Sequence, residues 1–502
     1  MKRALLINWD SYPHYTSGGV YTWAKGLIEN IQDWEFVVLN QLSNPNANAK
    51  FSVPSNVKKV IGLPVFGAYR VEEYLGDTGR LLPKIMRTAD SVVERQFLPL
   101  YNEFLRAIMA DNCDPERLSE LISKLHNFLT LYDSRKCFEN PQVWEAFLEQ
   151  VSSDPLYRQM KLREALLNFQ VLQHSLQLLS LRMPKVDLVH SSLAWLPALA
   201  GIAAKQESDC PMIVTEHGVA FRELVLYYGM FLYNEPSKIF WTKFSRNIVR
   251  TVYRKADLIV PVCHANEVWE VSLGANPSKI KVIYNGVDVE KFRPMKVKTT
   301  GRPTVVSVAR ISVFKDIAAL IHATNYVRQQ IGDIQCLVFG ESTEPEYSGM
   351  CVDLVDKLKL KDNFKFMGGT KEPEKAYALG DVVAFSSITE GFPFAVIEAM
   401  ACGKAVVATD VGGVGEALQG CGLIVKSRSP RELANAMLTL LGDRELRRKF
   451  GDAALTRARQ NFDLKVSIAH YKEVYESLTG PVMAQRAPQR AEAPQRTEVL
   501  VR

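Results

Sequence analysis

The sequence predicts an α/β protein made of two doubly wound parallel-sheet domains, with a helical insertion in the first of them. The chain has 502 residues, which is too long for a single hydrophobic core. Short apolar runs alternate with longer amphipathic ones, as they do in the βαβ units of a parallel sheet. The alternation is interrupted between about residues 68 and 183, where apolar residues recur at helical spacing.

The first domain is expected to span residues 1–290. In its insertion, the apolar residues of 97–108 and of 162–179 repeat at helical spacing, and no strand pattern lies between them. A helix is expected from about Val20 to Ile31. The expected strands are Arg3 to Asn8, Glu35 to Asn40, Lys58 to Gly62, Val186 to Ser191, Met212 to Glu216, Leu258 to Val262 and Lys281 to Tyr284.

The second domain is expected at 304–460, after a linker at 291–303 that is rich in Lys, Thr, Gly and Pro. A C-terminal helix is expected at 461–480, and it can cross back to the first domain. The tail at 481–502 has too little apolar content to order itself, so we expect it to be disordered. The expected strands are Thr304 to Val308, Cys336 to Phe339, Phe364 to Met367, Val382 to Ser386, Ala405 to Thr409 and Leu423 to Val425.

The composition is that of an ordinary globular protein, with 47% hydrophobic and 23% charged residues. The formal net charge of +6 is small for this length. It is compatible with phosphate-bearing ligands or with an anionic membrane surface. No run of Lys and Arg is dense enough to indicate nucleic-acid binding, so we expect no nucleic acid among the partners.

The eight cysteines are scattered and lack the spacing of a zinc site, which predicts buried, reduced thiols. The chain begins with Met-Lys-Arg and a short apolar run that fits a strand better than a signal peptide. No stretch approaches the length of a membrane-spanning helix. We therefore expect a cytoplasmic protein, with a peripheral place at the inner face of the membrane as an option.

The segment 381–410 carries the clearest chemical signal, because a strand, a loop, a helix and a second strand can all be read from it. Glu390 lies in the loop, and Glu398 lies just over one turn into the helix that starts at Phe394. Carboxylates accept paired hydrogen bonds from sugar diols, and a helix N-terminus favours a pyrophosphate. We expect Glu390 to hold a transferred sugar and Glu398 a ribose.

The competing interpretation makes Glu398 a solvated acid on a helix face and Glu390 an ordinary loop charge. The residues between them favour the binding site, because they form an apolar wedge beside the first acid. These residues are Gly391, Phe392, Pro393 and Phe394.

This spaced acid pair resembles the signature of glycosyltransferase family 4, and the resemblance extends from Gly301 to about Arg459. Ser17-Gly18-Gly19-Val20-Tyr21 in the first domain also fits. More narrowly, the helical insertion and several short segments are similar to the PelF-like branch, the cytosolic glycosyltransferases of Pel exopolysaccharide synthesis. These segments are Tyr12-Pro13 with Gly18-Gly19-Val20, residues 186–190, Pro197-Ala198 and Thr215 to Val219.

The resemblance implies a GT-B fold, in which two Rossmann-like domains face each other across a cleft. It also implies that Arg310 and Lys315 clamp the pyrophosphate of the donor. A departing diphosphate gains about one full charge, and each cation contributes roughly 4 kcal/mol at about 4 Å before desolvation costs. The sequence contains no Asp-x-Asp, so we expect no metal and assign the charge stabilisation to the two cations. The competing interpretation is a solvated helix start.

Gly18 and Gly19 follow the first strand, where missing side chains let backbone amides approach a phosphate or an acceptor. They lack the G-x-G-x-x-G spacing, so NAD or FAD is not expected. His217 ends a buried strand and resembles the family's contact to the donor sugar near the reacting carbon; the competing interpretation is a structural histidine. The family retains anomeric configuration, which implies a same-face mechanism assisted by the leaving phosphate.

The function that the resemblance implies is transfer of a sugar from a nucleotide sugar, with a UDP-hexose or UDP-N-acetylhexosamine as the family default, to a polysaccharide or glycoconjugate acceptor in exopolysaccharide synthesis. Membrane-embedded polysaccharide synthesis proteins are the expected partners. Two alternatives stay open. One is a catalytically silent sugar-nucleotide-binding subunit of a membrane assembly. The other is a sugar-nucleotide epimerase or hydrolase of the same fold.

Overall fold

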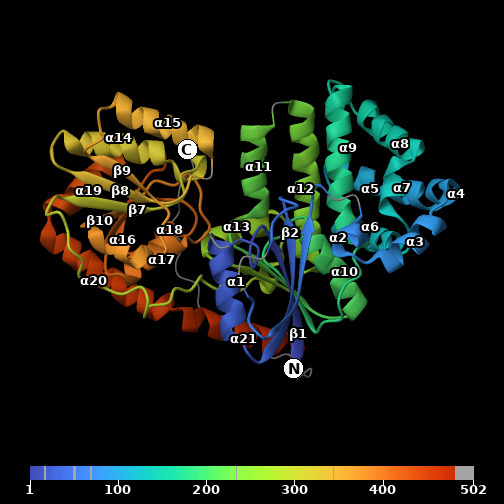
Figure 1. The fold of residues 1–502 in the computed structure, drawn as a ribbon, viewed down its shortest axis with the longest axis horizontal. Helices are drawn as coiled ribbons and strands as arrows, with labels where there is room; N and C mark the ends of the chain where they lie inside the picture. Colours follow the sequence, from blue (N-terminus) through green and yellow to red (C-terminus); the bar gives the residue numbers. More distant parts are fainter. Residues whose placement is uncertain (16–17, 49–51, 68–69, 233, 343, 481–502) are drawn as a thin grey trace.

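The computed structural model describes residues 1–480 except 16–17, 49–51, 68–69, 233 and 343. It contains two six-stranded parallel sheets, with the orders β3-β2-β1-β4-β5-β6 and β12-β11-β10-β7-β8-β9. Both sheets carry helices, so the predicted α/β class is confirmed (Figure 1). The expected disordered tail at 481–502 lies outside the described residues.

The first sheet is built around β1, whose apolar residues Ala4 to Ile7 are all fully buried because helices cover both faces. The chain runs outward from β1 to β3 on one side and from β4 to β6 on the other. The switch between the two directions leaves a crevice at the carboxyl ends of the strands, where ligands bind in such sheets. The strands are β1 (Lys2–Trp9), β2 (Trp34–Leu42), β3 (Val57–Pro64), β4 (Leu188–Ser191), β5 (Met212–Glu216) and β6 (Leu258–Pro261).

The expected strand at 281–284 is wrong. Lys281 and Ile283 donate backbone hydrogen bonds to the carbonyls of Ile259 and Pro261, at 3.0 Å each, but only an isolated bridge forms. Pro261 directs its carbonyl to this segment and has no N–H to complete the ladder. A regular seventh strand therefore does not form.

Among its described residues, the insertion between β3 and β4 contains only helices and the loops that join them, and it lies at the end of the molecule away from the second domain (Figure 1). Its apolar faces share one continuous core with the first sheet and with the long helix α12. The insertion helices are α2 (Val71–Leu75), α3 (Thr78–Arg87), α4 (Asp90–Val92), α5 (Leu98–Met109), α6 (Pro115–Leu129), α7 (Ser134–Glu139), α8 (Pro141–Ser153) and α9 (Leu162–Leu176).

The remaining helices of the first domain cover the sheet or face the second domain. Asn234 caps α12 by accepting a hydrogen bond from Ser237 N, with Pro236 in the first turn. These helices are α1 (Gly19–Asn30), α10 (Ala198–Ser208), α11 (Ala220–Phe231), α12 (Glu235–Lys255) and α13 (His264–Ser272).

The second domain repeats the doubly wound pattern. Its strands are β7 (Thr304–Val308), β8 (Gln335–Phe339), β9 (Phe364–Gly368), β10 (Val382–Phe385), β11 (Ala405–Thr409) and β12 (Gly422–Val425). Its helices are α14 (Ile317–Arg328), α15 (Pro345–Lys357), α16 (Pro373–Leu379), α17 (Phe394–Ala401), α18 (Val414–Ala417), α19 (Pro430–Gly442) and α20 (Arg444–Asn461).

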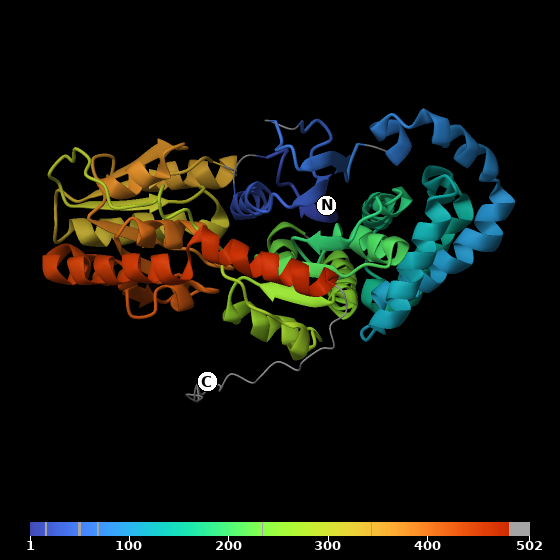
Figure 2. The same ribbon diagram turned by 90° about the horizontal axis from the view of Figure 1, so that it is seen from below.

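The last helix, α21 (Leu464–Thr479), leaves the second domain and packs against the first, beside α1 (Figure 2). Backbone bonds from Val287 to Phe462 and from Leu464 to Val287, at 2.8 and 2.9 Å, hold the crossing point. Farther along α21, Tyr475 is fully buried in the first domain, and its hydroxyl lies 2.8 Å from Nδ1 of His190. The helix thus ties the two domains together.

The eight cysteines are all buried with free thiols, as expected. Within the described part of the chain, no helix combines the length and the apolar character needed to cross a membrane.

Candidate active site between the two domains

The loops that follow β5 and β10 meet between the two domains. Gly391 lies so close to the first domain that a Cβ atom on it would be 1.6 Å from the carbonyl oxygen of His217. Gly413, in the next loop, likewise approaches Cys263. The Asn285 side chain donates to the carbonyl of Phe392 at 2.8 Å. The carboxyl ends of both sheets therefore face one another, which is where a ligand binds in a doubly wound fold.

An ion pair between Lys315 and Glu390 lies at the centre of this region. It joins Lys315 Nζ to Glu390 Oε1, and the two side chains are 22% and 14% exposed. The hydroxyl of Ser387 donates to the same carboxylate oxygen at 2.7 Å. From the first domain, Arg222 donates to the backbone carbonyl of Glu390 at 3.0 Å. The structure thus brings together two of the residues expected from the sequence, at the carboxyl ends of β7 and β10.

A small pocket surrounds this ion pair, and its floor is apolar. Apart from Lys315, Glu390, Ser387 and Thr409, its lining consists of Val308, Ala309, Phe385, Pro393, Ala395, Val396, Ala408 and Val414. An apolar surround lowers the local dielectric, so charges inside it interact more strongly than at the surface.

His217 enters from the first domain directly after β5. Both of its ring nitrogens are buried and have no hydrogen-bond partner among the described residues. The ring packs edge-on against Trp23, with 4.7 Å between the ring centroids. Burial lowers the pKa of His217 to about 3, so its imidazole is neutral at physiological pH. A neutral imidazole with both nitrogens unpaired can donate one hydrogen bond and accept another.

Two glycines expected at the site lie at the start of α1. Gly18 adopts φ 106°, which favours glycine, and no atom lies within 4 Å of the position of a Cβ. A Cβ on Gly19 would lie 3.3 Å from the ring of Phe394, the first residue of α17. The N-termini of α1 and α17 therefore lie close together between the two domains, and the N-terminus of a helix favours an anion.

Arg310 and Glu398 are less closely connected to the ion pair. Arg310 is exposed, and none of the described residues forms an ion pair or hydrogen bond with its side chain. Glu398 is not part of the pocket lining: its Oε2 accepts a hydrogen bond from the hydroxyl of Tyr377 on α16, at 2.9 Å. Burial raises the pKa of Glu398 to about 7.

Sequence reasoning missed Arg222 and Glu223 on α11. Glu223 folds back toward the β5 loop, so that a Cβ on Gly218 would be 1.9 Å from its Oε1. Burial raises the pKa of Glu223; the charges of Arg222 and Lys315 oppose this rise, and that of Glu390 adds to it. The first domain thus presents a carboxyl group to the ion pair. The sequence signal that would have identified this group is a charged pair in the first turn of a helix, five residues after His217.

Among the residues that the structure describes, no group of three or more His, Cys, Asp or Glu side chains is arranged to hold a metal ion.

Comparisons with known proteins divide the chain at the same place as the structure. Residues 3–278 match the family described as "Domain of unknown function (DUF3492)", and residues 288–457 match "Glycosyl transferases group 1".

Two curated relatives are glycosyltransferases. One is N-acetylgalactosamine-N,N'-diacetylbacillosaminyl-diphospho-undecaprenol 4-alpha-N-acetylgalactosaminyltransferase of Campylobacter jejuni, 31% identical over 228 residues, covering 44% of this chain and 60% of that relative. The other is D-inositol 3-phosphate glycosyltransferase of Kineococcus radiotolerans, 29% identical over 60% of this chain and 73% of that protein. The chain therefore spans only about 60% of the length of the Campylobacter enzyme.

Two solved structures share the fold over 95% of this chain. Anabaena Alr3699/HepE in complex with UDP and glucose has a TM-score of 0.60 at 17% identity, and the match covers 100% of that chain. Sucrose-phosphate synthase from Thermosynechococcus elongatus has a TM-score of 0.60 at 18% identity, with 99% of that chain covered. The GT-B arrangement of two Rossmann-like domains expected from the sequence is thereby confirmed.

Proposed function

We propose that this chain, which belongs to the DUF3492 family and carries a glycosyl transferases group 1 domain, moves a sugar from a nucleotide-sugar donor bound between its two domains. The group 1 domain and the glycosyltransferase relatives support the enzyme class expected from the sequence. The identities of the donor and the acceptor and the stereochemical outcome of the transfer are parts of the proposal.

The observation that carries the proposal is the Lys315–Glu390 ion pair, whose loop meets the loop of His217, a residue with two unpaired ring nitrogens. A sugar diphosphate offers each of these groups a partner: phosphate oxygens for the ammonium, and sugar hydroxyls for the carboxylate and the imidazole. Because His217 is neutral, it bonds a hydroxyl without adding a charge beside the reacting carbon. A UDP-linked sugar is the donor that we favour, and the Anabaena complex with UDP and glucose supports that choice.

In this proposal Lys315 and Arg310 hold the diphosphate and stabilise the charge that develops as the glycosidic bond breaks. Lys315 is paired with Glu390, so in this proposal the donor's phosphate competes for the ammonium and frees the carboxylate to accept hydrogen bonds from the sugar. Exposed Arg310 closes on the diphosphate from the β7 loop. The backbone amides at Gly18 and Gly19 approach from the first domain.

Glu398 is proposed to bind the ribose. One of its oxygens is engaged by Tyr377, whereas the other has no hydrogen bond among the described residues and is available to a diol. The wedge formed by Gly391, Phe392, Pro393 and Phe394 sets the approach of the donor to the N-terminus of α17.

Retention of anomeric configuration, independence from metal ions and a role in exopolysaccharide synthesis are further parts of the proposal, and they rest on the family 4 and PelF-like segments of the sequence. The acceptor class is a polysaccharide or glycoconjugate. The diphospho-undecaprenol named for the Campylobacter relative supports a lipid-linked glycan within that class. Membrane-embedded synthesis proteins are the proposed partners.

The test is to incubate the purified protein with a panel of nucleotide sugars and glycan acceptors, with and without chelator. Nucleotide release that depends on the acceptor and survives chelation supports the transferase. Release without acceptor indicates a hydrolase, an altered donor sugar indicates an epimerase, and binding without turnover indicates a silent subunit.

The matched variants are Lys315→Met and Lys361→Met, the latter at a side chain that is 73% exposed. We expect the first to lose turnover by at least about 100-fold, the scale of removing one preorganised donor to a developing anion. The second should behave as the unaltered protein. Normal turnover by Lys315→Met would remove this residue from the site.

A further inference from the structure

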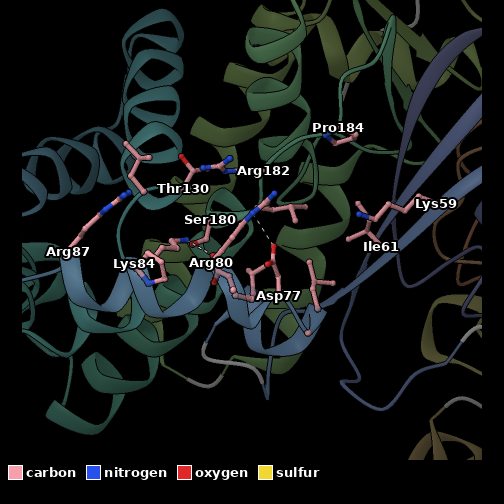
Figure 3. Close-up of a pocket in the computed structure, with 18 residues that line it drawn as sticks. Lys59, Ile61, Asp77, Arg80, Lys84, Arg87, Thr130, Ser180, Arg182 and Pro184 are labelled. Carbon is pink, nitrogen blue, oxygen red and sulfur yellow. Dashed lines mark hydrogen bonds and ion pairs between the residues drawn. The ribbon is translucent and has the colours of Figure 1, made fainter.

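A second cavity, of about 600 Å³, lies in the first domain at the junction of β3 with the helical insertion. Its lining comes only from residues 59–87, 130–131 and 180–184, so no residue of the second domain contributes to it. Figure 3 shows α3 along one side of it, with the segment that carries Ser180 and Arg182 opposite. Its size is in the usual range of small-molecule sites. The cavity is separate from the proposed donor site.

The lining is strongly cationic. It includes two carboxylates, Glu72 and Asp77, and both are already paired. Glu72 forms a buried ion pair with Lys84 at 2.5 Å, and Asp77 lies 3.3 Å from Arg80. The five cations of the lining are Lys59, Arg80, Lys84, Arg87 and Arg182. Five positive and two negative side chains leave a net charge of +3 around the cavity.

Three of these cations have no protein partner: Lys59, Arg87 and Arg182 form no ion pair or side-chain hydrogen bond with any described residue. They come from three different segments of the chain, β3, α3 and the stretch before β4. Surface charges in general are solvated and need no partner. All three side chains are exposed, but they line one concavity and give it a positive potential that favours an anion.

Two further observations point to a ligand. Ser180 is a lining residue of the cavity and is only 3% exposed, and its Oγ has no hydrogen-bond partner among the described residues. In addition, the ten-residue helix α3 begins at the cavity, and no atom lies within 4 Å of the Cβ position of Gly79 in its first turn. Free N–H groups at a helix N-terminus, a buried hydroxyl and arginines are the groups that bind phosphate oxygens.

We propose that this cavity binds a phosphate-bearing ligand with at least two negative charges, at a site distinct from the donor site. Arg87 and Arg182 hold the phosphoryl oxygens, and Lys59 approaches from the β3 side. The apolar part of the lining, Val71, Leu75 and Leu131 among others, faces the less polar body of the ligand. The inference is independent of the proposed transferase reaction.

Inorganic pyrophosphate is a suitable probe because it carries only the charged part of the ligand. Its binding to the full chain is measured by titration calorimetry for the unaltered protein, for Arg87→Gln/Arg182→Gln and for Lys59→Gln. Arg163→Gln is the matched control, since Arg163 is exposed on α9 and outside the cavity. The double variant should lose affinity at this site by at least about tenfold for each arginine removed, and Lys59→Gln by a smaller factor.

The titration is repeated with Lys315→Met to distinguish binding at the cavity from binding at the donor site. The pyrophosphate binding that depends on Arg87 and Arg182 should persist in this variant. Unchanged pyrophosphate affinity in both cavity variants would overturn the proposal, as would an equal loss in Arg163→Gln. Thermal unfolding of each variant shows that the fold is retained.

The source of the phosphate is tested by flotation with phosphatidylglycerol vesicles against phosphatidylcholine vesicles. Co-flotation with the anionic vesicles that is lost in the double variant assigns the phosphate to a lipid headgroup. Pyrophosphate binding without co-flotation assigns it to a free phosphate compound. If the unaltered protein binds neither pyrophosphate nor the anionic vesicles, the site is refuted.

Discussion

Gly391→Ala tests whether the contact between the two domains sets the geometry of the site. An added Cβ would lie 1.6 Å from the carbonyl oxygen of His217 and 2.6 Å from its carbon. Contacts of this kind essentially never fall below 3.0 Å, so the loop after β10 must move away from the loop after β5 by about 1.4 Å. Glu390 moves with it, because it precedes Gly391 in the chain. A displacement of about 1 Å from productive geometry costs about 100-fold in rate.

The assay is steady-state transfer with the donor and acceptor identified by the panel. We expect kcat/KM to fall about 100-fold for Gly391→Ala. Gly349→Ala is the control, because Gly349 lies in α15 with no atom within 4 Å of its Cβ position; it should leave activity unchanged and stabilise the protein by about 0.5–1 kcal/mol. Activity of Gly391→Ala within twofold of the unaltered protein would refute the reasoning.

Two further predictions concern carboxyl groups of the first domain. Burial raises the pKa of Glu270 to about 8 from 4.5, so the folded state keeps the proton that the unfolded chain loses, and stability should fall as pH rises between about 5 and 8. At 1.36 kcal/mol per pKa unit the loss is at most about 4–5 kcal/mol, and Glu270→Gln should abolish it. Urea unfolding at pH 6 and pH 8 measures this, and an equal difference between variant and unaltered protein at both pH values would contradict it. Glu223→Gln should lower kcat/KM by about tenfold or more without changing the melting temperature, because it removes a carboxyl group that faces Glu390 and Lys315; a fall in melting temperature with normal kcat/KM would instead mark Glu223 as structural.

Local sequence patterns predicted much of the fold. The apolar run of β1 identifies a strand buried on both faces, and Pro393 before Phe394 marks the start of α17, as the structure shows. The spacing of Glu390 and Glu398 placed both acids on the correct loop and helix. The expected strand at 281–284 was wrong because apolar composition alone does not show whether the neighbouring strand has the backbone N–H groups that a regular ladder requires.

The sequence by itself determined the two parallel sheets, the helical insertion and the candidate acids and cations, because burial periodicity and turn residues act over a few neighbouring positions. The tertiary structure alone decided which of those side chains meet. It paired Lys315 with Glu390 and placed Glu223 of the first domain near that ion pair. It also bonded Glu398 to Tyr377 and placed Arg87 and Arg182 around one cavity. Such contacts depend on how whole domains and helices pack, and no local pattern in a single sequence records that packing.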